Sequence, residues 1–460
     1  MSPTDTTEPA VSIRGAIALR TTEAVQLWLE TIDDPAERER ELNSLSKADL
    51  RALGELLDTD TGIDLLESLS EDSGATLLRV LPTPRAAGYL DLLDSDHAAD
   101  LLREVDAGTR EEWLTAMPHE RAQVLRGLLS WPQDCVAAHM VPETLTVHPE
   151  MTAAEAVEAI RGHTWRLRGD SRTGAYVYVA DADARLLGVV PFRNLVLAEA
   201  DQAVADMMKR DIVTVSPLTD QEDAATLLAD HRLVALPVVD ADDRLLGVLT
   251  EDDAAGIAEE EATEDAEKQG GSAPLEVPYL KASPWLLWRK RIVWLLVLFI
   301  AEAYTGTVLR HFEEEMEAVV ALAFFIPLLI GTGGNTGTQI TTTLVRAMAT
   351  GDVRLRDLPK ILGKEMTTGS MIALAMAVAA TIRAWTLGVG PEVTVTVALT
   401  VAAIVLWASF VSSILPLALK KFRVDPAVVS APMIATIVDG TGLMIYFWIA
   451  HLTLPQLAGL

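Results

Sequence analysis

The chain contains a single cysteine, Cys135, among its 460 residues. One cysteine excludes an intrachain disulfide framework and fits a reducing compartment. Positive charge is also scarce: 37 Lys and Arg stand against 66 Asp and Glu, for a net charge of −29. Such a chain is a poor match for nucleic acid and a better one for cations. The N-terminal residues MSPTDTTEPA are polar and acidic, so they do not predict a signal peptide.

The acidic residues are unevenly distributed along the chain. Residues 281–460 hold 11 Asp and Glu and 14 Lys and Arg, so 55 of the 66 acidic and 23 of the 37 basic residues lie before them. This partition predicts an acidic soluble region followed by a membrane domain. A solvated acidic surface in a salt-tolerant host would explain much of the charge, but not its partition.

Long apolar runs follow residue 284, and each is long enough to cross about 30 Å of hydrocarbon. The five runs lie near residues 285–309, 316–346, 366–387, 393–419 and 427–454. Basic residues precede the first run and fill the second-to-third and fourth-to-fifth connections. The positive-inside rule places these loops and the acidic N-terminal region in the cytoplasm, and five spans then put the C-terminus outside.

Two repeating patterns occupy the soluble region. Between residues 46 and 130, short leucine-rich stretches recur roughly every eleven or twelve residues, which predicts a superhelix of short helices. Further along, YVADADARLLGVV at 178–190 returns as PVVDADDRLLGVL at 237–249, an offset of 59 residues. Each copy predicts a strand, an acidic turn, a second strand and the start of a helix.

This duplicated unit resembles a tandem pair of CBS modules, which commonly pair face to face as a regulatory unit. Such modules can bind adenosine nucleotides, including ATP, but no specific residue of this sequence indicates that they do so here.

The second apolar run carries glycines and polar residues in Phe325–Gly351. Glycines let helices approach closely and let the backbone face a ligand. Polar groups at membrane depth are tolerated where they pack on protein or line a wet cavity. The last run adds one carboxylate, Asp439, which is costly in a membrane unless it is solvated or paired. The two segments together predict a pore or substrate path.

Further motifs follow in order: FFIPLLIGTGGNTGTQ at 324–339, VRAMAT at 345–350, KEM at 364–366, VDPA at 424–427 and PMIATIVDGTGLMIYF at 432–447. On these motifs the chain closely resembles the MgtE family of magnesium channels and transporters. The resemblance implies a homodimer with one pore on its two-fold axis, which the cytoplasmic domains close when internal magnesium is high.

The resemblance also implies the fold class, a multidomain membrane protein. It comprises an α-helical superhelical N-domain, an α/β tandem CBS pair and an all-α five-span transmembrane domain. We expect the N-domain at 1–135, with about residues 1–20 flexible. The remaining boundaries are CBS modules at 136–203 and 204–257, a connecting helix and linker at 258–284, and the transmembrane domain at 285–460.

By the resemblance, Asp439 is the ion-binding residue of the pore. Ala435, through its carbonyl, and Thr436 would face the same ion, and Asn335 would support the pore wall. Mg²⁺ keeps several of its waters and binds through one or two carboxylates, so two copies of Asp439 around a dimer axis suit a hydrated ion. The structural alternative is a carboxylate that accepts a hydrogen bond from a hydroxyl of a neighbouring helix.

Two residues of the membrane region stand outside this scheme. Ala431 occupies a position where related sequences often carry Asn, and the missing amide could loosen ion selectivity or affinity. Glu302, in the first span, either faces the dimer interface or the pore, or lies near the outer end of the span in water.

Acidic residues before the membrane domain match positions that bind regulatory magnesium in the family: Asp220, Glu222, Asp223, Asp253, Glu259, Glu261 and Glu264. Such acids repel one another when Mg²⁺ is low and are bridged when it is high, which would favour a closed state. A solvated acidic helix face is the alternative for each. Two positions that related sequences fill with acids are Arg232 and Gly256 here, so we expect weaker or shifted gating.

The sequence therefore predicts a Mg²⁺-selective channel in the cytoplasmic (inner) membrane of a prokaryote, and not an enzyme. Mg²⁺ is both the expected cargo and the expected regulator. The expected partners are a second copy of the chain and the lipid bilayer, without nucleic acid or an obligate protein partner. The alternatives are a secondary carrier for Mg²⁺, Co²⁺ or Mn²⁺, and a membrane-bound Mg²⁺ sensor without flux.

Overall fold

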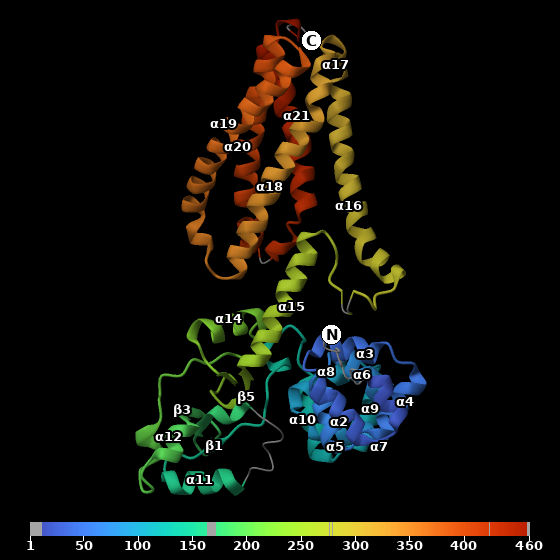
Figure 1. The fold of residues 1–460 in the computed structure, drawn as a ribbon. Helices are drawn as coiled ribbons and strands as arrows, with labels where there is room; N and C mark the ends of the chain where they lie inside the picture. Colours follow the sequence, from blue (N-terminus) through green and yellow to red (C-terminus); the bar gives the residue numbers. More distant parts are fainter. Residues whose placement is uncertain (1–11, 163–171, 276, 278, 423, 458–460) are drawn as a thin grey trace, which may run out of the picture. The chain divides into compact units, whose positions relative to one another are not determined.

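The computed structural model describes residues 12–162, 172–275, 277, 279–422 and 424–457 (Figure 1). The chain divides into two compact units, one ending at Glu259 and the other beginning at Glu260. Each unit has its own apolar core.

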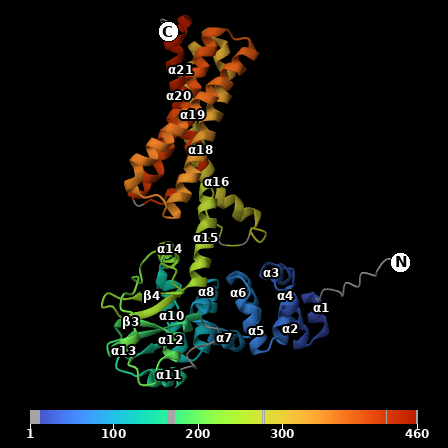
Figure 2. The same cartoon turned by 60° about the vertical axis from the view of Figure 1, so that its left-hand side comes forward.

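The first unit opens with a series of short helices. They are α1 (Ile13–Leu19), α2 (Thr22–Thr31), α3 (Pro35–Asn43), α4 (Lys47–Leu56), α5 (Thr59–Glu67), α6 (Glu71–Val80), α7 (Thr83–Leu92), α8 (Ser95–Arg103), α9 (Ala107–Ala116) and α10 (His119–Leu129). From α4 onward each helix packs against the next but one, and Figure 2 shows them following one another in a row. This stacking buries the leucine stripes.

Helix α1 lies within the segment for which the sequence predicts flexibility. Ser12 caps it by accepting a hydrogen bond from the Gly15 amide. Ile13 and Ala16 are buried on one face, because residues three apart lie on the same side of a helix. Residues 13–19 therefore form a helix whose apolar face packs into the core.

The rest of the first unit holds the duplicated modules. The first consists of β1 (Thr146–Val147), α11 (Ala153–Gly162), β2 (Tyr176–Ala180), β3 (Leu186–Pro191) and α12 (Phe192–Leu197). The second consists of α13 (Val204–Met207), α14 (Gln221–His231), β4 (Ala235–Val239), β5 (Leu245–Thr250) and the start of α15 (Glu251–Gln269). Strand β1 runs parallel to β2, and both hairpins, β2–β3 and β4–β5, are antiparallel.

The two hairpins repeat the same backbone detail. Asp181 accepts hydrogen bonds from the amides of residues 183 and 185, and Asp240 does the same for residues 242 and 244. A left-handed residue closes each turn, Ala184 with φ 63° and Asp243 with φ 60°. The turns also bind each other: the Leu186 amide donates to the Asp243 carbonyl, and the Leu245 amide to the Ala184 carbonyl. The repeat in the sequence is thus a pair of equivalent hairpins in mutual contact.

Helix α15 begins at Glu251, directly after β5, rather than near residue 258. Three acids, Glu251, Asp252 and Asp253, occupy its first turn, where negative charge is favourable because of the helix dipole. The connecting helix expected after the second module is therefore continuous with that module.

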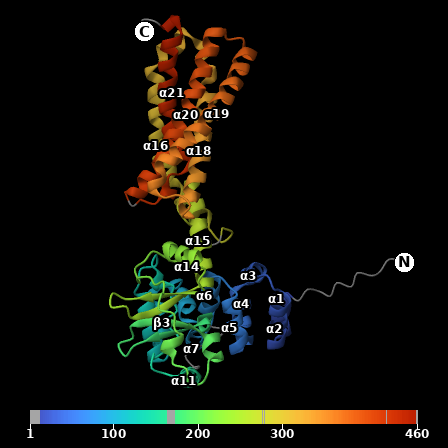
Figure 3. The same ribbon diagram turned by 90° about the vertical axis from the view of Figure 1, so that its left-hand side faces the viewer.

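Among its described residues, the second unit contains five helices long and apolar enough to cross a membrane. They are α16 (Pro284–His311), α18 (Ile326–Ala349), α19 (Leu358–Leu387), α20 (Pro391–Lys421) and α21 (Ala431–Thr453), with a short α17 (Glu313–Ala318) after α16. Helix α18 packs against α20 and α21, α16 against α21, and α19 against α20 (Figures 1 and 3). The five apolar runs of the sequence correspond to these helices.

The glycine-rich segment is one regular helix, α18, and two of its glycines form close helix contacts. A Cβ atom at Gly333 would lie 2.6 Å from Val438 of α21, and one at Gly337 would lie 2.5 Å from Ile434. Such short distances leave no room for a side chain. These two glycines hold α18 close to the helix that carries Asp439.

Candidate ion path and cation sensor

Asp439 lies on α21 where that helix faces α18. A Cβ atom at Gly334 would be 3.7 Å from the Asp439 Oδ1 atom and 3.3 Å from the Cβ of Ala435. Oδ1 is buried, and none of the described residues donates a hydrogen bond to it. The nearby hydroxyls of Thr436 and Thr441 donate instead to backbone carbonyls of their own helix. The described residues thus offer Asp439 no hydroxyl partner of the kind that the structural alternative requires.

The other predicted pore residues fall into two groups. Ala435 and Asp439 both face Gly334, so the structure brings these two together. Thr436 is half-buried, with its hydroxyl 3.0 Å from the Pro432 carbonyl oxygen. Asn335 is exposed in the single chain.

The predicted regulatory acids lie on α14 and α15. Asp220 caps α14 by accepting from the amides of Glu222 and Asp223, at 2.9 and 3.4 Å. This contact gives Asp220 a structural role, because it satisfies amides that the helix leaves without partners. The acids on α15 are Asp253, Glu259, Glu261 and Glu264. Over the described part of the chain, no three His, Cys, Asp or Glu side chains gather in a metal-binding group.

Asp253 instead lies beside a residue that the sequence did not single out, Asp96 of α8. Asp96 is 8% exposed. Burial, followed by the charge of Asp253, raises the pKa of Asp96 well above its usual range. Burial also raises the pKa of Asp253, although a hydrogen bond from Thr250 opposes the shift. Two carboxyl groups buried together disfavour their charged forms, and a bound cation would relieve this cost.

Asp94, two residues before Asp96, belongs to the same acidic surroundings. Its pKa is raised to about 6, first by burial and then by the charges of Glu67 and Glu143. We call Asp94, Asp96 and Asp253 the acidic cluster. Only the sequence run Asp94-Ser95-Asp96 could have signalled it, and that run looks like an ordinary helix start.

A buried cation stands beside the acidic cluster. Arg121 of α10 lies 3.2 Å from Glu143 and also donates to the hydroxyl of Ser95 and the Leu93 carbonyl. These contacts hold the beginning of α8 in place. Because Arg121 already neutralises Glu143, it leaves the charge of Asp96 and Asp253 largely uncompensated.

Gly256 and Arg232 occupy the two sensor positions that related sequences fill with acids, and the structure shows where each lies. Gly256 is exposed on α15, and a Cβ atom there would meet nothing within 4 Å. Arg232 ends α14 in a left-handed conformation with φ 51°.

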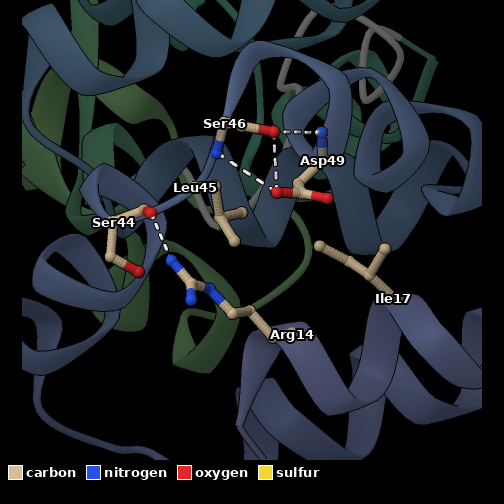
Figure 4. A pocket seen from close by; sticks show the side chains of 6 residues that line it. All are labelled: Arg14, Ile17, Ser44, Leu45, Ser46 and Asp49. Carbon is tan, nitrogen blue, oxygen red and sulfur yellow. Dashed lines mark hydrogen bonds between the residues drawn. The ribbon is translucent and has the colours of Figure 1, made fainter.

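A pocket of about 380 Å³ lies in the N-terminal helices and is lined by Arg14, Ile17, Ser44, Leu45, Ser46 and Asp49 (Figure 4). Its polar groups bind one another. Arg14 donates to the Ser44 carbonyl at 2.6 Å, and Ser46 and Asp49 form a capping box at the start of α4. The polar groups that line the pocket are therefore explained by the hydrogen bonds that they form within the N-terminal helices.

One of the acidic residues after the first span is buried and contacts a histidine. Glu315 of α17 lies 3.1 Å from the Nε2 atom of His451 on α21. Glu315 is 8% exposed, so it connects α17 to the end of the last span. Of the three consecutive acids Glu313–Glu315, Glu315 is therefore packed into the protein rather than solvated.

The fold and these sites define a multidomain membrane protein with tandem CBS modules. The family model described as a divalent cation transporter, MgtE, matches residues 326–449. The MgtE intracellular N domain matches residues 33–134, and the CBS domain matches 136–201 and 204–259. The chain belongs to the MgtE family.

Two relatives support this assignment. The magnesium transporter MgtE of Thermus thermophilus is 39% identical over 73% of this chain and 74% of its own length. The magnesium transporter MgtE of Bacillus subtilis is 28% identical over 73% of each chain. A solved cytosolic domain of the Mg²⁺ channel MgtE in complex with ATP is 30% identical, with a TM-score of 0.49. It covers 54% of this chain and 100% of its own.

Proposed function

We propose that this chain forms a Mg²⁺-selective channel that admits Mg²⁺ and is closed by cytoplasmic Mg²⁺. The single observation that carries the proposal is Asp439, a carboxylate in an apolar helix whose buried Oδ1 has no donor among the described residues. A carboxylate at membrane depth is costly unless it is solvated or paired, and a hydrated cation supplies both. The two relatives named as magnesium transporters support Mg²⁺ as the cation.

The proposed active form is a homodimer in the cytoplasmic membrane, with residues 1–280 in the cytoplasm and the C-terminus outside. Two copies of Asp439 around a two-fold axis would hold a hydrated divalent ion without stripping its waters. Ala435, Thr436 and Asn335 would line the same path. Flow would be passive, because each elementary charge gains about 2.3 kcal/mol per 100 mV of membrane potential.

The proposed sensor is centred on Asp96 and Asp253. A divalent cation between these two carboxylates would offset the cost of burying them, which raises both pKa values. Binding would favour the conformation in which the two groups meet, and the shift is limited by the difference in affinity between the two conformations. Asp220, Glu222, Asp223, Glu259, Glu261 and Glu264 are proposed as further cation-responsive positions.

The test is Mg²⁺ influx into proteoliposomes containing wild type, Asp439→Asn or Thr441→Ser, at several cytoplasmic-side Mg²⁺ concentrations. Thr441→Ser is the matched control, since it lies two residues away and keeps its hydroxyl. We expect Asp439→Asn to lose flux and wild-type flux to fall as cytoplasmic Mg²⁺ rises. Unchanged flux in Asp439→Asn would contradict the pore assignment. A requirement for a proton or Na⁺ gradient would favour the carrier, and no flux from folded dimer would favour the sensor without flux.

A further inference from the structure

Glu302 lies in the middle part of α16, on the side of that helix that faces α21. Thr305 and Val308 are the buried residues of α16. Glu302 precedes Thr305 by three residues, and residues three apart share a helix face. The carboxylate thus continues the protein-facing side of α16, although it is exposed in the single chain.

A close contact sets the depth of Glu302 relative to Asp439. A Cβ atom at Gly440 would lie 2.2 Å from the ring of Tyr304 and 3.3 Å from the hydroxyl oxygen of Thr305. Gly440 directly follows Asp439, and Tyr304 is two residues from Glu302. The two carboxylates therefore lie at a similar level of the bundle and act on each other electrostatically.

Two neighbouring carboxylates in an apolar bundle require compensation. Neither forms an ion pair within the described residues. A charged side chain in contact with lipid costs several kcal/mol, so charged residues in membrane helices usually face water or the protein interior. Hydrated divalent cations are held by one or two carboxylates, which matches this pair.

We propose that Glu302 is a second carboxylate of the ion path and contributes to its preference for divalent cations. The proposal rests on the proposed function, in which ions pass Asp439. Asp439 binds the hydrated ion, and Glu302 adds negative charge at the same depth from the neighbouring helix. In a dimer, the path would carry four carboxylates rather than two.

The first test measures water access in the full-length protein in proteoliposomes. Cys135 is the single cysteine and is buried, so Cys135→Ser gives a cysteine-free background. Glu302→Cys is compared with Ile300→Cys, which is 73% exposed but lies about 140° around the helix from Thr305. We expect a membrane-impermeant cationic methanethiosulfonate to modify Glu302→Cys and not Ile300→Cys, and Mg²⁺ to slow the reaction. No modification at position 302, or modification at a rate indifferent to Mg²⁺, would overturn the proposal.

The second test measures Mg²⁺ flux in Glu302→Gln. We expect the Mg²⁺ concentration for half-maximal flux to rise roughly tenfold, a loss of about 1.4 kcal/mol in binding. Discrimination against K⁺ should weaken as well. If Glu302→Gln matches wild type while Asp439→Asn abolishes flux, the inference about Glu302 is wrong and the proposed function stands. If Asp439→Asn also keeps its flux, the proposed function itself fails.

Discussion

The ammonium nitrogen of Lys268 lies 2.7 Å from the Oδ2 atom of Asp425. Lys268 is in the last turn of α15, and Asp425 lies in the loop that leads into α21. Lys268 also forms an ion pair with Glu264, one turn earlier on α15. Burial alone would lower the pKa of Lys268, but hydrogen bonds to Asp425 and Glu264 outweigh it and raise the pKa above its usual range. The ammonium group of Lys268 is therefore charged at neutral pH. It joins the end of α15 to the loop that leads into α21, and this contact needs no metal ion.

A second contact reinforces the junction between the end of α15 and the start of α21. Gly271 lies just beyond α15, and a Cβ atom there would be 2.7 Å from the ring of Trp294 on α16. The Trp294 indole donates to Ser430, which caps α21. The end of α15 is thus fixed to the same end of the helix that carries Asp439.

We predict that Lys268→Gln makes this junction dependent on metal. Without the ammonium group, Glu264, Asp265 and Asp425 are left as three neighbouring acids that repel one another until a divalent cation binds. Hydrogen exchange of residues 264–273 should increase in EDTA and return to the wild-type level with Mg²⁺. Wild type and Lys360→Gln, an exposed lysine of α19, should match each other in both conditions at these residues, with a smaller difference between EDTA and Mg²⁺ than Lys268→Gln. Protection in Lys268→Gln that ignores Mg²⁺ would rule out the lysine as the connection.

We predict that Asp96→Asn stabilises the first unit in EDTA and reduces its response to Mg²⁺. The change removes a buried carboxyl group whose ionisation is unfavourable and leaves a neutral side chain of the same shape, which should be worth about 1–2 kcal/mol. Thermal unfolding with and without Mg²⁺ measures both effects. Asp211→Asn, on an exposed residue, is the control and should leave the Mg²⁺ response intact. A full Mg²⁺ response in Asp96→Asn would remove Asp96 from the sensor.

A pH dependence follows from Asp94. Its pKa is raised from 3.8 to about 6 in the folded state, so the folded protein holds this proton more tightly than the unfolded chain. The resulting stability is present at low pH and is lost as the pH rises through 6. In EDTA, we expect the free energy of unfolding to fall by about 1 kcal/mol between pH 5 and 7, after allowance for partial solvent screening. Asp94→Asn should flatten this part of the profile. A wild-type stability that rises over this range would show that other groups dominate.

The glycines of α18 predict unequal effects of adding a methyl group. Gly337→Ala places a Cβ atom 2.5 Å from Ile434, whereas a Cβ atom at Gly331 meets nothing within 4 Å. Gly337→Ala should lower stability in detergent by about 1–3 kcal/mol because the helices must separate. Gly331→Ala should be neutral or slightly stabilising, because alanine favours helix. Equal melting temperatures for the two variants would contradict the packing described here.

Local sequence patterns predicted much of this fold. The five spans follow from run length, the hairpins from the repeat at an offset of 59 residues, and Asp439 from its charge in an apolar run. The contacts that build the sensor and the junction could not be predicted in this way. Lys268 and Asp425 are 157 residues apart, and no local pattern connects them. The sequence could not place Asp96 beside Asp253 for the same reason, because only tertiary packing brings α8 to the start of α15.

The glycine-rich helix α18 shows a second feature that the sequence alone could not predict. The sequence showed that α18 approaches other helices closely, but not which glycines make the contact. Gly333 and Gly337 face α21, whereas Gly331 faces open space, because the rotation of the helix depends on the packing of α20 and α21 around it.

The two equivalent hairpins, β2–β3 and β4–β5, also bear on the evolution of the chain. The stretches 178–190 and 237–249 are identical at nine of thirteen positions, and both hairpins keep the bulge that follows Val179 in one copy and Val238 in the other. Both also keep the aspartate-closed turn, although its left-handed residue is Ala184 in one and Asp243 in the other. Two unrelated hairpins would have little reason to share an irregularity at the same place. The two CBS modules therefore descend from one ancestral module that was copied in tandem, and the aspartate that closes the turn is the same in both copies.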